Sequence, residues 1–383
     1  MLIVRVLAAA AKPALVAAAI GGGATGAYTV AGGDLPGRGH TSAFQQIQDD
    51  GQRLIVSEFG PRTDTIVALD PDDPSARTTI ARIDHAEGYG VFATLSPDGR
   101  AIAYTALPPE LGKPSPDDPA QAGIIDIDGG VTLLAGDADL LVAPVWSPDS
   151  ESVVARRNTP EEDSAGSFEL LLLGRDGSRR SITQWASAAV FPIAFAPDGS
   201  ALYFATLSPS GSDLYRVAPD GSDETLIAHL SDEIARDWKL SPDGATLAYS
   251  VAESGATPRI VTKTLDVASG ASSEVLTASG PRAEYNPAWS PDNEVTIAAA
   301  RPGGGADAVL VGDTGATEQI ASSRTGIDLP LGWSPDGAKL AVRAIEGASA
   351  FEAGESHLEL IDGDGTRQRV SRSADVLIVG WLE

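Results

Sequence analysis

The sequence predicts an all-β protein: a seven-bladed β-propeller of four-stranded antiparallel blades, with its ring closed by the C-terminal strand. Three observations support this. A turn phrase recurs six times, its copies are nearly evenly spaced, and the last strand matches the start of a further repeat. Repeats of about 40–50 residues made of short strands are typical of propeller blades.

The recurring phrase is a large apolar residue, then Ser-Pro-Asp-Gly or a close variant, then a short apolar strand. A type I turn favours Ser or Asp at its first position, Pro at its second and Gly at its fourth. Each copy is therefore predicted to be a tight turn between two antiparallel strands. The copies are Leu95–Gly99, Trp146–Ser150, Phe195–Gly199, Leu240–Gly244, Trp289–Asn293 and Trp333–Gly337.

The spacing between copies sets the size of the repeat. The serine-equivalent positions are 96, 147, 196, 241, 290 and 334, so the copies lie 51, 49, 45, 49 and 44 residues apart. Alternating and β-branched runs bounded by Gly, Asp and Pro predict four strands in each period. In the repeat of the Phe195–Gly199 turn, the strands after the turn are expected at Ala201–Ala205, Leu214–Ala218 and Thr225–Ala228. We expect the three tryptophans that directly precede turns to lie between blades.

The two ends of the repeat region give the number of blades. Asp49–Gly51 occupies a turn position 48 residues before Ser96, and Val376–Trp381 matches the strand that precedes a turn. Pairing this last strand with the first repeat would close the ring, which otherwise exposes the edges of its first and last blades. A strand at Phe44–Gln48 is the alternative, but Val376–Val379 is more apolar and is favoured.

Residues 1–33 differ from the repeats. Arg5 and Lys12 are their only charges, and residues 13–33 form an uncharged run rich in Ala, Val and Gly. A basic start before an apolar run predicts a signal peptide or an N-terminal membrane anchor, and a buried helix is the alternative. The basic residues precede the run, so the rest of the chain is predicted to be extracytoplasmic, in the periplasm or at the cell surface. Residues 34–44 are predicted to be a linker, and residues 45–383 the propeller.

Charge and composition exclude several classes of partner and site. The chain has 27 basic and 53 acidic residues and a net charge of −26, which argues against binding nucleic acid or anionic lipid through a basic face. It has no cysteine, which excludes disulfides, thiol catalysis and thiolate metal sites. The membrane is expected to be contacted only through the N-terminal segment.

The repeated Trp-Ser-Pro-Asp-Gly phrase and the apolar strand after it resemble the repeats of TolB-type β-propellers, over residues from about 45 to 383. Similar repeats occur in bacterial envelope proteins and in the propellers of prolyl-oligopeptidase-type peptidases. The sequence differs from TolB, which has an α/β domain before its propeller, and from the peptidases, which have a hydrolase domain. The resemblance implies an extracytoplasmic binding or scaffold role.

Catalytic and metal-binding motifs are not found in the sequence. It has no Gly-x-Ser-x-Gly elbow, no His-Glu-x-x-His and no phosphate-binding loop, and its four histidines never occur at metal-ligand spacing. Asp126–Gly129 and Asp362–Gly365 are read as turns rather than calcium loops, because the EF-hand pattern is incomplete. We therefore expect no catalytic residues, no metal and no cofactor.

Large residues near the blade-to-blade loops are the candidate binding residues, because aromatic and Arg side chains are the usual anchors of interfaces. In so acidic a chain, Arg residues around one mouth are suited to an anionic ligand or an acidic peptide. The alternative is that each Arg pairs only with a local acid. The candidates are Tyr89, Trp185, Arg236, Arg282, Tyr285 and Arg324.

These observations predict a non-catalytic cell-envelope binding or scaffold protein that contacts a protein or peptide. Two alternatives differ in kind. One is an extracytoplasmic hydrolase or lyase with its site in the central funnel, and the other is the sensor domain of a membrane-anchored regulator. An enzyme requires converging carboxylates or His with shifted pKa values, whereas a binding module requires an accessible aromatic and Arg patch.

Overall fold

The structure is a computed structural model, in which the described residues are Ile47 and 51–383 apart from 127–128, 160–166, 187, 255–258, 277–282, 302–303, 313–316, 322–325, 348–354 and 372–375. The predicted export or anchor segment and the linker lie outside these residues. No helix in the described part of the chain is long and apolar enough to cross a membrane.

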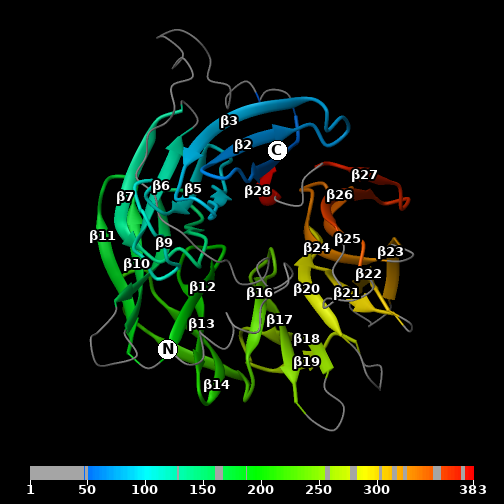
Figure 1. Ribbon diagram of the computed structural model, residues 1–383. Coiled ribbons are helices and arrows are strands. Elements are labelled where there is room, and N and C mark those ends of the chain that lie inside the picture. The colour runs from blue at the N-terminus through cyan, green and yellow to red at the C-terminus, as the bar shows by residue number, and fades with distance from the viewer. Residues whose placement is uncertain are drawn as a thin grey trace. The chain divides into compact units, whose positions relative to one another are not determined.

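The described chain is all-β, and its strands form antiparallel sheets in chain order (Figure 1). The first four-stranded sheets are β28-β1-β2-β3, β4-β5-β6-β7 and β11-β10-β9-β8. Their strands are β1 (Arg53–Glu58), β2 (Thr63–Leu69), β3 (Arg77–Asp84), β4 (Phe92–Leu95), β5 (Ala101–Ala106), β6 (Ala120–Asp126), β7 (Val131–Ala138), β8 (Val145–Trp146), β9 (Ser152–Thr159), β10 (Ser167–Gly174), β11 (Arg179–Trp185) and β28 (Val376–Leu382).

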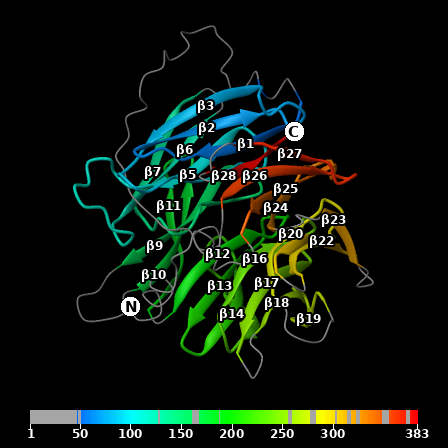
Figure 2. The same ribbon diagram turned by 45° about the vertical axis from the view of Figure 1, so that its right-hand side comes forward.

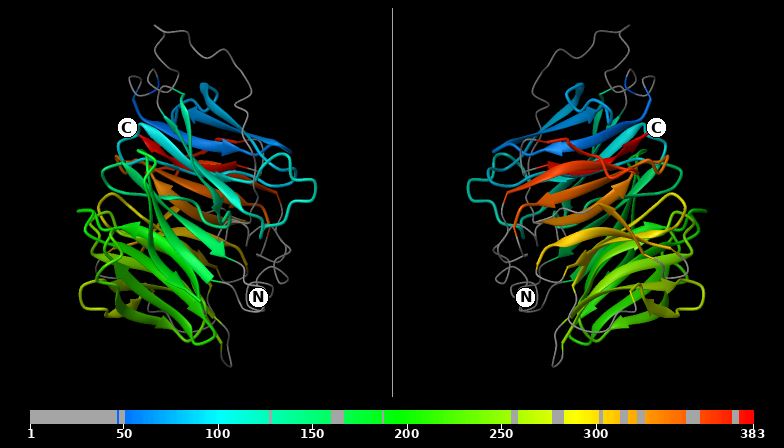
Figure 3. Two further views of the ribbon diagram at one scale, coloured as in Figure 1. Left: turned by 90° about the vertical axis from the view of Figure 1, so that its left-hand side faces the viewer. Right: turned by 90° about the vertical axis from the view of Figure 1, so that its right-hand side faces the viewer.

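Two more four-stranded sheets follow, β12-β13-β14-β15 and β16-β17-β18-β19, drawn in green to yellow-green (Figure 3). The remaining strands form a single larger sheet. Their strands are β12 (Ala189–Phe195), β13 (Leu202–Ser208), β14 (Gly211–Val217), β15 (Thr225–Ser231), β16 (Ala235–Leu240), β17 (Thr246–Glu253), β18 (Arg259–Asp266), β19 (Ser272–Glu274), β20 (Glu284–Trp289), β21 (Val295–Ala300), β22 (Ala306–Val311), β23 (Thr317–Ala321), β24 (Ile327–Trp333), β25 (Lys339–Ile345), β26 (Ser356–Asp362) and β27 (Arg367–Arg369).

The propeller prediction is confirmed, but the prediction of seven blades is wrong. The structure has five separate four-stranded blades, and β20 to β27 form one eight-stranded sheet instead of two further blades. The join is a parallel pairing of Ala306 in β22 with Ile327 in β24. The spacing of the turns gives the number of repeats, but it carries no information on hydrogen bonds between neighbouring repeats. The merged units are also those with the shortest turn spacing, 44 residues.

The chain divides into two compact units. Of the described residues, the first unit contains Ile47, residues 51–204, Val217–Glu224 and the C-terminal strand, and the second contains those of Ala205–Arg216 and Thr225–Ala374.

In the first unit, the C-terminal strand completes the first blade, as predicted. β28 pairs antiparallel with β1, from Arg53 opposite Leu382 to Glu58 opposite Val376 (Figures 1 and 2). Val379 and Leu382 are buried in the same apolar cluster as Ile55 of β1. The alternative closing strand, Phe44–Gln48, lies outside the described residues except for Ile47.

The repeated turns adopt the conformation that their residues predict. In the first, Ser96 Oγ donates to Asp98 Oδ1 at 2.6 Å and accepts from the Ala101 amide at 2.9 Å. The Gly99 amide donates to the Ser96 carbonyl at 2.9 Å, and Gly99 has a φ of 66°. Ser147, Ser241 and Ser334 each donate to the Asp two residues later in the same way.

The tryptophans before the turns connect consecutive repeats, as expected. Trp146 Nε1 donates to the Thr94 carbonyl at 3.0 Å in the first unit. In the second unit, Trp289 Nε1 donates to the Lys239 carbonyl at 2.9 Å and Trp333 Nε1 to Thr296 Oγ1 at 2.9 Å. Each indole therefore packs against the preceding repeat and satisfies its own N–H there.

Candidate functional site

Four of the six predicted binding residues lie in the described part of the chain, two in each unit. Arg282 and Arg324 lie outside the described residues. Tyr89 and Trp185 belong to the first unit, and Arg236 and Tyr285 belong to the second. Each pair is therefore considered within its own unit.

Tyr89 and Trp185 are held by contacts within the first unit. The Tyr89 hydroxyl donates to the Pro114 carbonyl at 3.0 Å, and burial, together with Asp118 and Asp117, raises its pKa. Trp185 ends the outer strand β11, with its ring edge-on to Phe204 at a centroid distance of 6.4 Å. Tyr89 thus holds the loop that contains Pro114, and Trp185 packs against a neighbouring aromatic ring.

Arg236 and Tyr285 occupy equivalent positions in the second unit. Each is the second residue of an edge strand, Arg236 in β16 and Tyr285 in β20, and these two strands lie beside each other. Both side chains are only partly buried. Burial raises the pKa of Tyr285, and the nearby Arg236 charge acts in the opposite direction. This is the only pair of predicted residues that the described contacts bring together.

The residue after each of them has an unusual backbone conformation. Asp237 has a φ of 57° and Asn286 a φ of 47°, both in the left-handed region. The register of β16 against β17 shifts between Arg236 and Lys239, and that of β20 against β21 shifts between Tyr285 and Ala288. Two adjacent edge strands therefore have a bulge at the same position, a feature that often lies beside functional sites.

Sequence reasoning missed Asp237 and Asn286, although the repeat alignment contains a signal for them. Each lies four residues before the turn residue of its repeat, Ser241 or Ser290. Asn and Asp are the residues that best tolerate the left-handed conformation apart from Gly. An Asx at the same position of two successive repeats could therefore have indicated the bulges.

The charged side chains of β16 at this site are two cations and one buried carboxylate, and β20 begins with the buried Glu284. Asp237 Oδ2 lies 3.6 Å from Arg236 Nε, and the Asp237 side chain is only 7% exposed. Burial raises the pKa of Asp237, and the charges of Arg236 and Lys239 act against this rise. The Lys239 side chain is solvent-accessible, but desolvation of its ammonium group lowers its pKa and the Asp237 charge acts against this fall. Arg236 and Lys239 thus act on the same buried carboxyl group.

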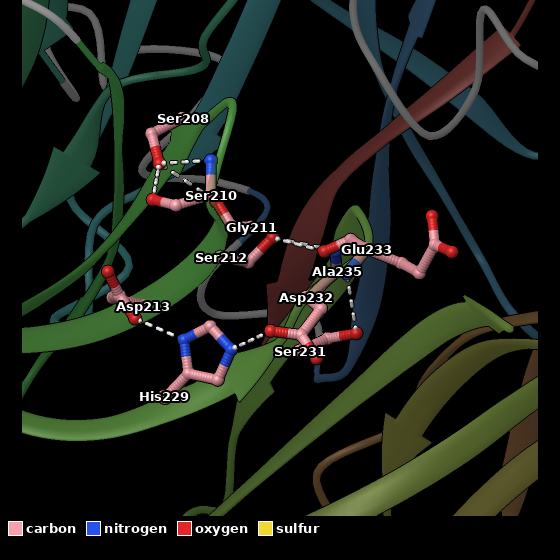
Figure 4. Close-up of polar contacts among 10 residues, drawn as sticks. All are labelled: Ser208, Ser210, Gly211, Ser212, Asp213, His229, Ser231, Asp232, Glu233 and Ala235. Atoms are coloured by element: carbon pink, nitrogen blue, oxygen red, sulfur yellow. Dashed lines mark hydrogen bonds and ion pairs between the residues drawn. The ribbon is translucent and has the colours of Figure 1, made fainter.

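Hydrogen bonds fix the connection that leads into β16 (Figure 4). Ser212 Oγ donates to the Glu233 carbonyl at 3.0 Å and accepts from the Ala235 amide at 2.9 Å. The Glu233 amide donates to Ser231 Oγ at 3.0 Å. Ser212 is fully buried, so these bonds are shielded from water and hold the chain just before Arg236.

His229 lies beside this connection, between two carboxylates (Figure 4). Its Nδ1 is 2.7 Å from Asp213 Oδ1 and its Nε2 is 3.2 Å from Asp232 Oδ1. The hydrogen bond to Asp213 raises the pKa of His229, with Asp232 adding to the rise and burial opposing it. Ser231 follows it two residues later in β15, but both ring nitrogens face carboxylates. The arrangement therefore favours an imidazolium ion pair and not a general base for a serine.

Among the described residues, no group of three or more His, Asp or Glu side chains is arranged to hold a metal ion. The geometry of the site suits recognition of a charged or polar group.

A sequence family model, described as the TolB beta propeller domain, matches residues 91–336, more than half of the chain. The chain belongs to the TolB beta-propeller family. No curated protein sequence matches it.

Solved structures of TolB and of propeller peptidases resemble this TolB-family chain. TolB from Acinetobacter baumannii is 16% identical with a TM-score of 0.50, over 89% of this chain and 67% of that one. The β-propeller domain of the Trilobed protease from Pyrococcus furiosus is 13% identical with a TM-score of 0.55, over 83% and 93%. Dipeptidyl peptidase 4 from Porphyromonas gingivalis is 15% identical with a TM-score of 0.53, over 83% and 50%. This chain thus spans about half of that peptidase.

At these identities the likeness shows the fold alone. The Pyrococcus propeller is described as having an open velcro topology, whereas in this TolB-family chain β28 pairs with β1.

Proposed function

We propose that this TolB-family chain is a non-catalytic binding or scaffold module of the cell envelope. It contacts a protein or peptide partner at the end of the second unit where β16 and β20 begin. The observation that carries the proposal is the pair Arg236 and Tyr285, which are partly exposed at equivalent positions of adjacent edge strands.

The chemistry of this pair suits a protein interface. Arg and Tyr are enriched among residues that dominate binding energy, since each combines a large contact area with directional hydrogen bonding. The fixed connection before Arg236 limits the entropy lost when a partner binds. Edge strands with bulges also present backbone groups that a partner can use.

An envelope location is supported by the N-terminal sequence and by the family. A basic start before an uncharged run at residues 13–33 is typical of export signals and membrane anchors. The net charge of −26 disfavours nucleic acid as a partner. We propose a periplasmic or surface-exposed propeller, and cell fractionation with an antibody against the chain tests this location.

Site-specific photo-crosslinking tests the binding surface. A photoreactive phenylalanine analogue at position 285 should form a discrete crosslinked product in intact envelopes, while the same analogue at Asp292, in the turn of the same repeat, should not. The Arg236→Gln variant should reduce the product at position 285. A product at 292 alone, or products of equal yield at both positions, would place the binding surface elsewhere.

A catalytic role is the second candidate, and Asp237 is the observation that favours it. A buried carboxyl group with a raised pKa beside an Arg is a possible general acid. The chain should then release products from peptides or from envelope polysaccharides, and the Asp237→Asn variant should not. Equal product release by both proteins, or none by either, would leave the binding role as the better account.

A further inference from the structure

At the candidate site, β16 and β20 each contain a bulge that interrupts their regular pairing with the neighbouring strand. Asp237 and Trp238 lie between the pairs Arg236 with Ser250 and Lys239 with Ala248, so two residues of β16 face one of β17. Asn286 and Pro287 form the same bulge in β20. A left-handed non-glycine residue costs about 1–2 kcal/mol. Its occurrence at equivalent positions of two adjacent strands suggests that the bulges serve a purpose other than stability.

The Arg236 guanidinium is incompletely neutralised. Its Nε is buried and has no hydrogen-bond partner among the described residues. Its nearest acid, Asp237, lies 3.6 Å away, beyond the range of a good hydrogen bond. A quarter of the side chain is nevertheless accessible, at 24%. Arg236 can therefore still accept a second anionic partner.

Lys239 adds a second cation on the same strand. Its side chain is solvent-accessible and follows the bulge along the strand, and desolvation lowers its pKa while Asp237 acts against this fall. The Arg236, Asp237 and Lys239 charges sum to one positive charge when all three are ionised. A single excess positive charge matches a monovalent anion better than a polyanion, which the net charge of −26 would repel.

We propose that Arg236 and Lys239 form a binding site for one carboxylate of the partner, and that Asp237 weakens this site by competing for the same cations. The proposal rests on the proposed function and names the chemical group that the surface recognises. A guanidinium binds a carboxylate through two parallel N–H donors, which gives directional recognition. The carboxylate is either the C-terminus of an extended segment or an Asp or Glu side chain.

Trp238 provides a direct measurement of binding, because it lies in the bulge between Asp237 and Lys239. The chain has six tryptophans, so 5-fluorotryptophan labelling gives six ¹⁹F signals, and the Trp238→Phe variant assigns the relevant one. Three probes are titrated into the full chain: acetyl-Ala-Ala-Ala with a free carboxylate, the same peptide as its amide, and acetyl-Ala-Glu-Ala amide.

We expect at least one carboxylate peptide to shift the Trp238 signal in a saturable way, at least fivefold more tightly than the neutral amide. The acetyl-Ala-Ala-Ala carboxylate binding more tightly indicates a C-terminus, and the glutamate peptide binding more tightly indicates an acidic side chain. If the neutral amide shifts the signal with the same affinity as both, the proposal is wrong.

The variants separate recognition from folding. Arg236→Gln should weaken carboxylate binding at least tenfold, whereas Asp237→Asn should tighten it severalfold because the competing charge is removed. Arg62→Gln removes a positive charge from an exposed pair with Glu87 and should leave binding unchanged. A purely structural role of Asp237 would not make Asp237→Asn bind the carboxylate peptide more tightly. Weaker carboxylate binding by this variant would contradict the proposal, even if Arg236→Gln failed to fold.

The two proposals fail in different ways. If crosslinking at position 285 captures a partner but Arg236→Gln and Asp237→Asn leave peptide affinity unchanged, the carboxylate site is wrong and the binding surface stands. If the carboxylate peptide binds as expected but position 285 forms no crosslink, the site is real and the protein-binding function is wrong.

Discussion

Two residues replace the last glycine of the repeated turn and keep its left-handed conformation. Ser150 has a φ of 61° and Asn293 a φ of 63°. Each side chain accepts a backbone N–H from the turn of the preceding repeat: Ser150 Oγ from Asp98 and Asn293 Oδ1 from Asp243, both at 3.1 Å. The unfavourable backbone conformation is thus compensated by a hydrogen bond that a glycine could not make.

This arrangement predicts which of two substitutions at Ser150 destabilises the protein more. Ser150→Ala keeps the left-handed backbone and leaves the Asp98 amide without its acceptor, so it should lower the free energy of unfolding by about 1–3 kcal/mol. Ser150→Gly loses the same bond but relieves the backbone, so it should cost about 1 kcal/mol less. Urea unfolding of the three proteins measures both differences. A glycine variant as unstable as the alanine variant would show that the backbone is unstrained.

A buried ion pair ties the first blade together. His85 Nε2 lies 2.9 Å from Asp64 Oδ1, and both side chains are inaccessible to solvent. His85 Nδ1 lies 2.9 Å from the Ala86 carbonyl and must donate to it, so both ring nitrogens carry protons when Asp64 is ionised. Asp64 also accepts the amides of Gly60 and Val91 at 3.0 and 2.8 Å. The pair therefore holds β2 to the connection that leads into the second blade.

The pair predicts a fall in stability at alkaline pH. Burial lowers the pKa of His85, but the hydrogen bonds to Asp64 and Ala86 outweigh it, so the folded pKa is raised. Unfolded His titrates near about 6.5. The stabilisation is therefore complete below that pH and is lost as the pH rises through the raised folded pKa.

Urea unfolding between pH 6 and pH 9 checks this prediction. The free energy of unfolding should decrease with pH in the wild type and much less in His85→Gln. His229→Gln should keep most of the decrease, because His229 is half exposed and its ion pairs are screened by water. At pH 6, His85→Ala should cost about 3–5 kcal/mol, since it leaves Asp64 buried without its partner. A pH slope unchanged in His85→Gln would assign the titration to another group.

At the scale of elements, the C-terminal strand β28 matters most for the stability of the first blade, because it buries one side of β1. β28 covers Leu54, Ile55 and Val56, which are fully buried in β1. β28 also packs closely against β4 of the second blade at Gly380, where a Cβ would lie 2.7 Å from Leu95 Cβ. The blade thus depends on a strand more than 300 residues away along the chain from its neighbour.

Leu382 tests how much this strand contributes. It is only 2% exposed and packs in the apolar cluster of the first blade. Leu382→Ala should lower the free energy of unfolding by about 2–5 kcal/mol through lost contacts and the cavity left behind. Leu377→Ala, at a half-buried position of the same strand, is the matched control and should cost less. Equal small effects would mean that β28 contributes little to the stability of the blade.

Individual turns and strands were predicted from the sequence more successfully than the pairing between neighbouring repeats. Turn chemistry is local, so the phrase beginning at Ser96 identified its turn and the strands beside it. The pairing of β28 with β1 was predictable because a leftover apolar strand needs a partner. The pairing of Ala306 with Ile327 was not predictable, because one hydrogen-bonded contact between repeats leaves no periodic pattern in the sequence.

The candidate site shows the same limit. Residue type and place in the repeat selected Arg236, Tyr285 and Trp185 alike, whereas the structure places the first two on adjacent edge strands. It places Trp185 on an outer strand against Phe204. The bulge at Asp237 depends on backbone conformation inside a strand, for which one residue is a weak guide and only its recurrence as Asn286 in the next repeat is a signal.

At the scale of the whole molecule, the dominant feature is an excess of negative charge. The net charge of −26 resides on a chain with only 27 basic residues, and many of these already form ion pairs. Like charges repel in the compact state and separate on unfolding, so the excess lowers stability. At an ionic strength of about 0.1 M the screening length falls to about 10 Å, which removes most long-range repulsion.

The melting temperature should therefore rise with sodium chloride between about 0.01 and 0.3 M, by about 2–4 °C for each kcal/mol of repulsion removed. Sodium chloride is preferred to sulfate, which stabilises proteins by being excluded from their surfaces. Glu151→Gln with Glu318→Gln provides the matched variant, because both residues are exposed and the double change makes the net charge less negative, from −26 to −24. It should melt higher than the wild type at low salt and equally at high salt. A melting temperature that falls with salt would mean that attractive pairs such as Arg367 with Asp328, at 2.7 Å, outweigh the repulsion.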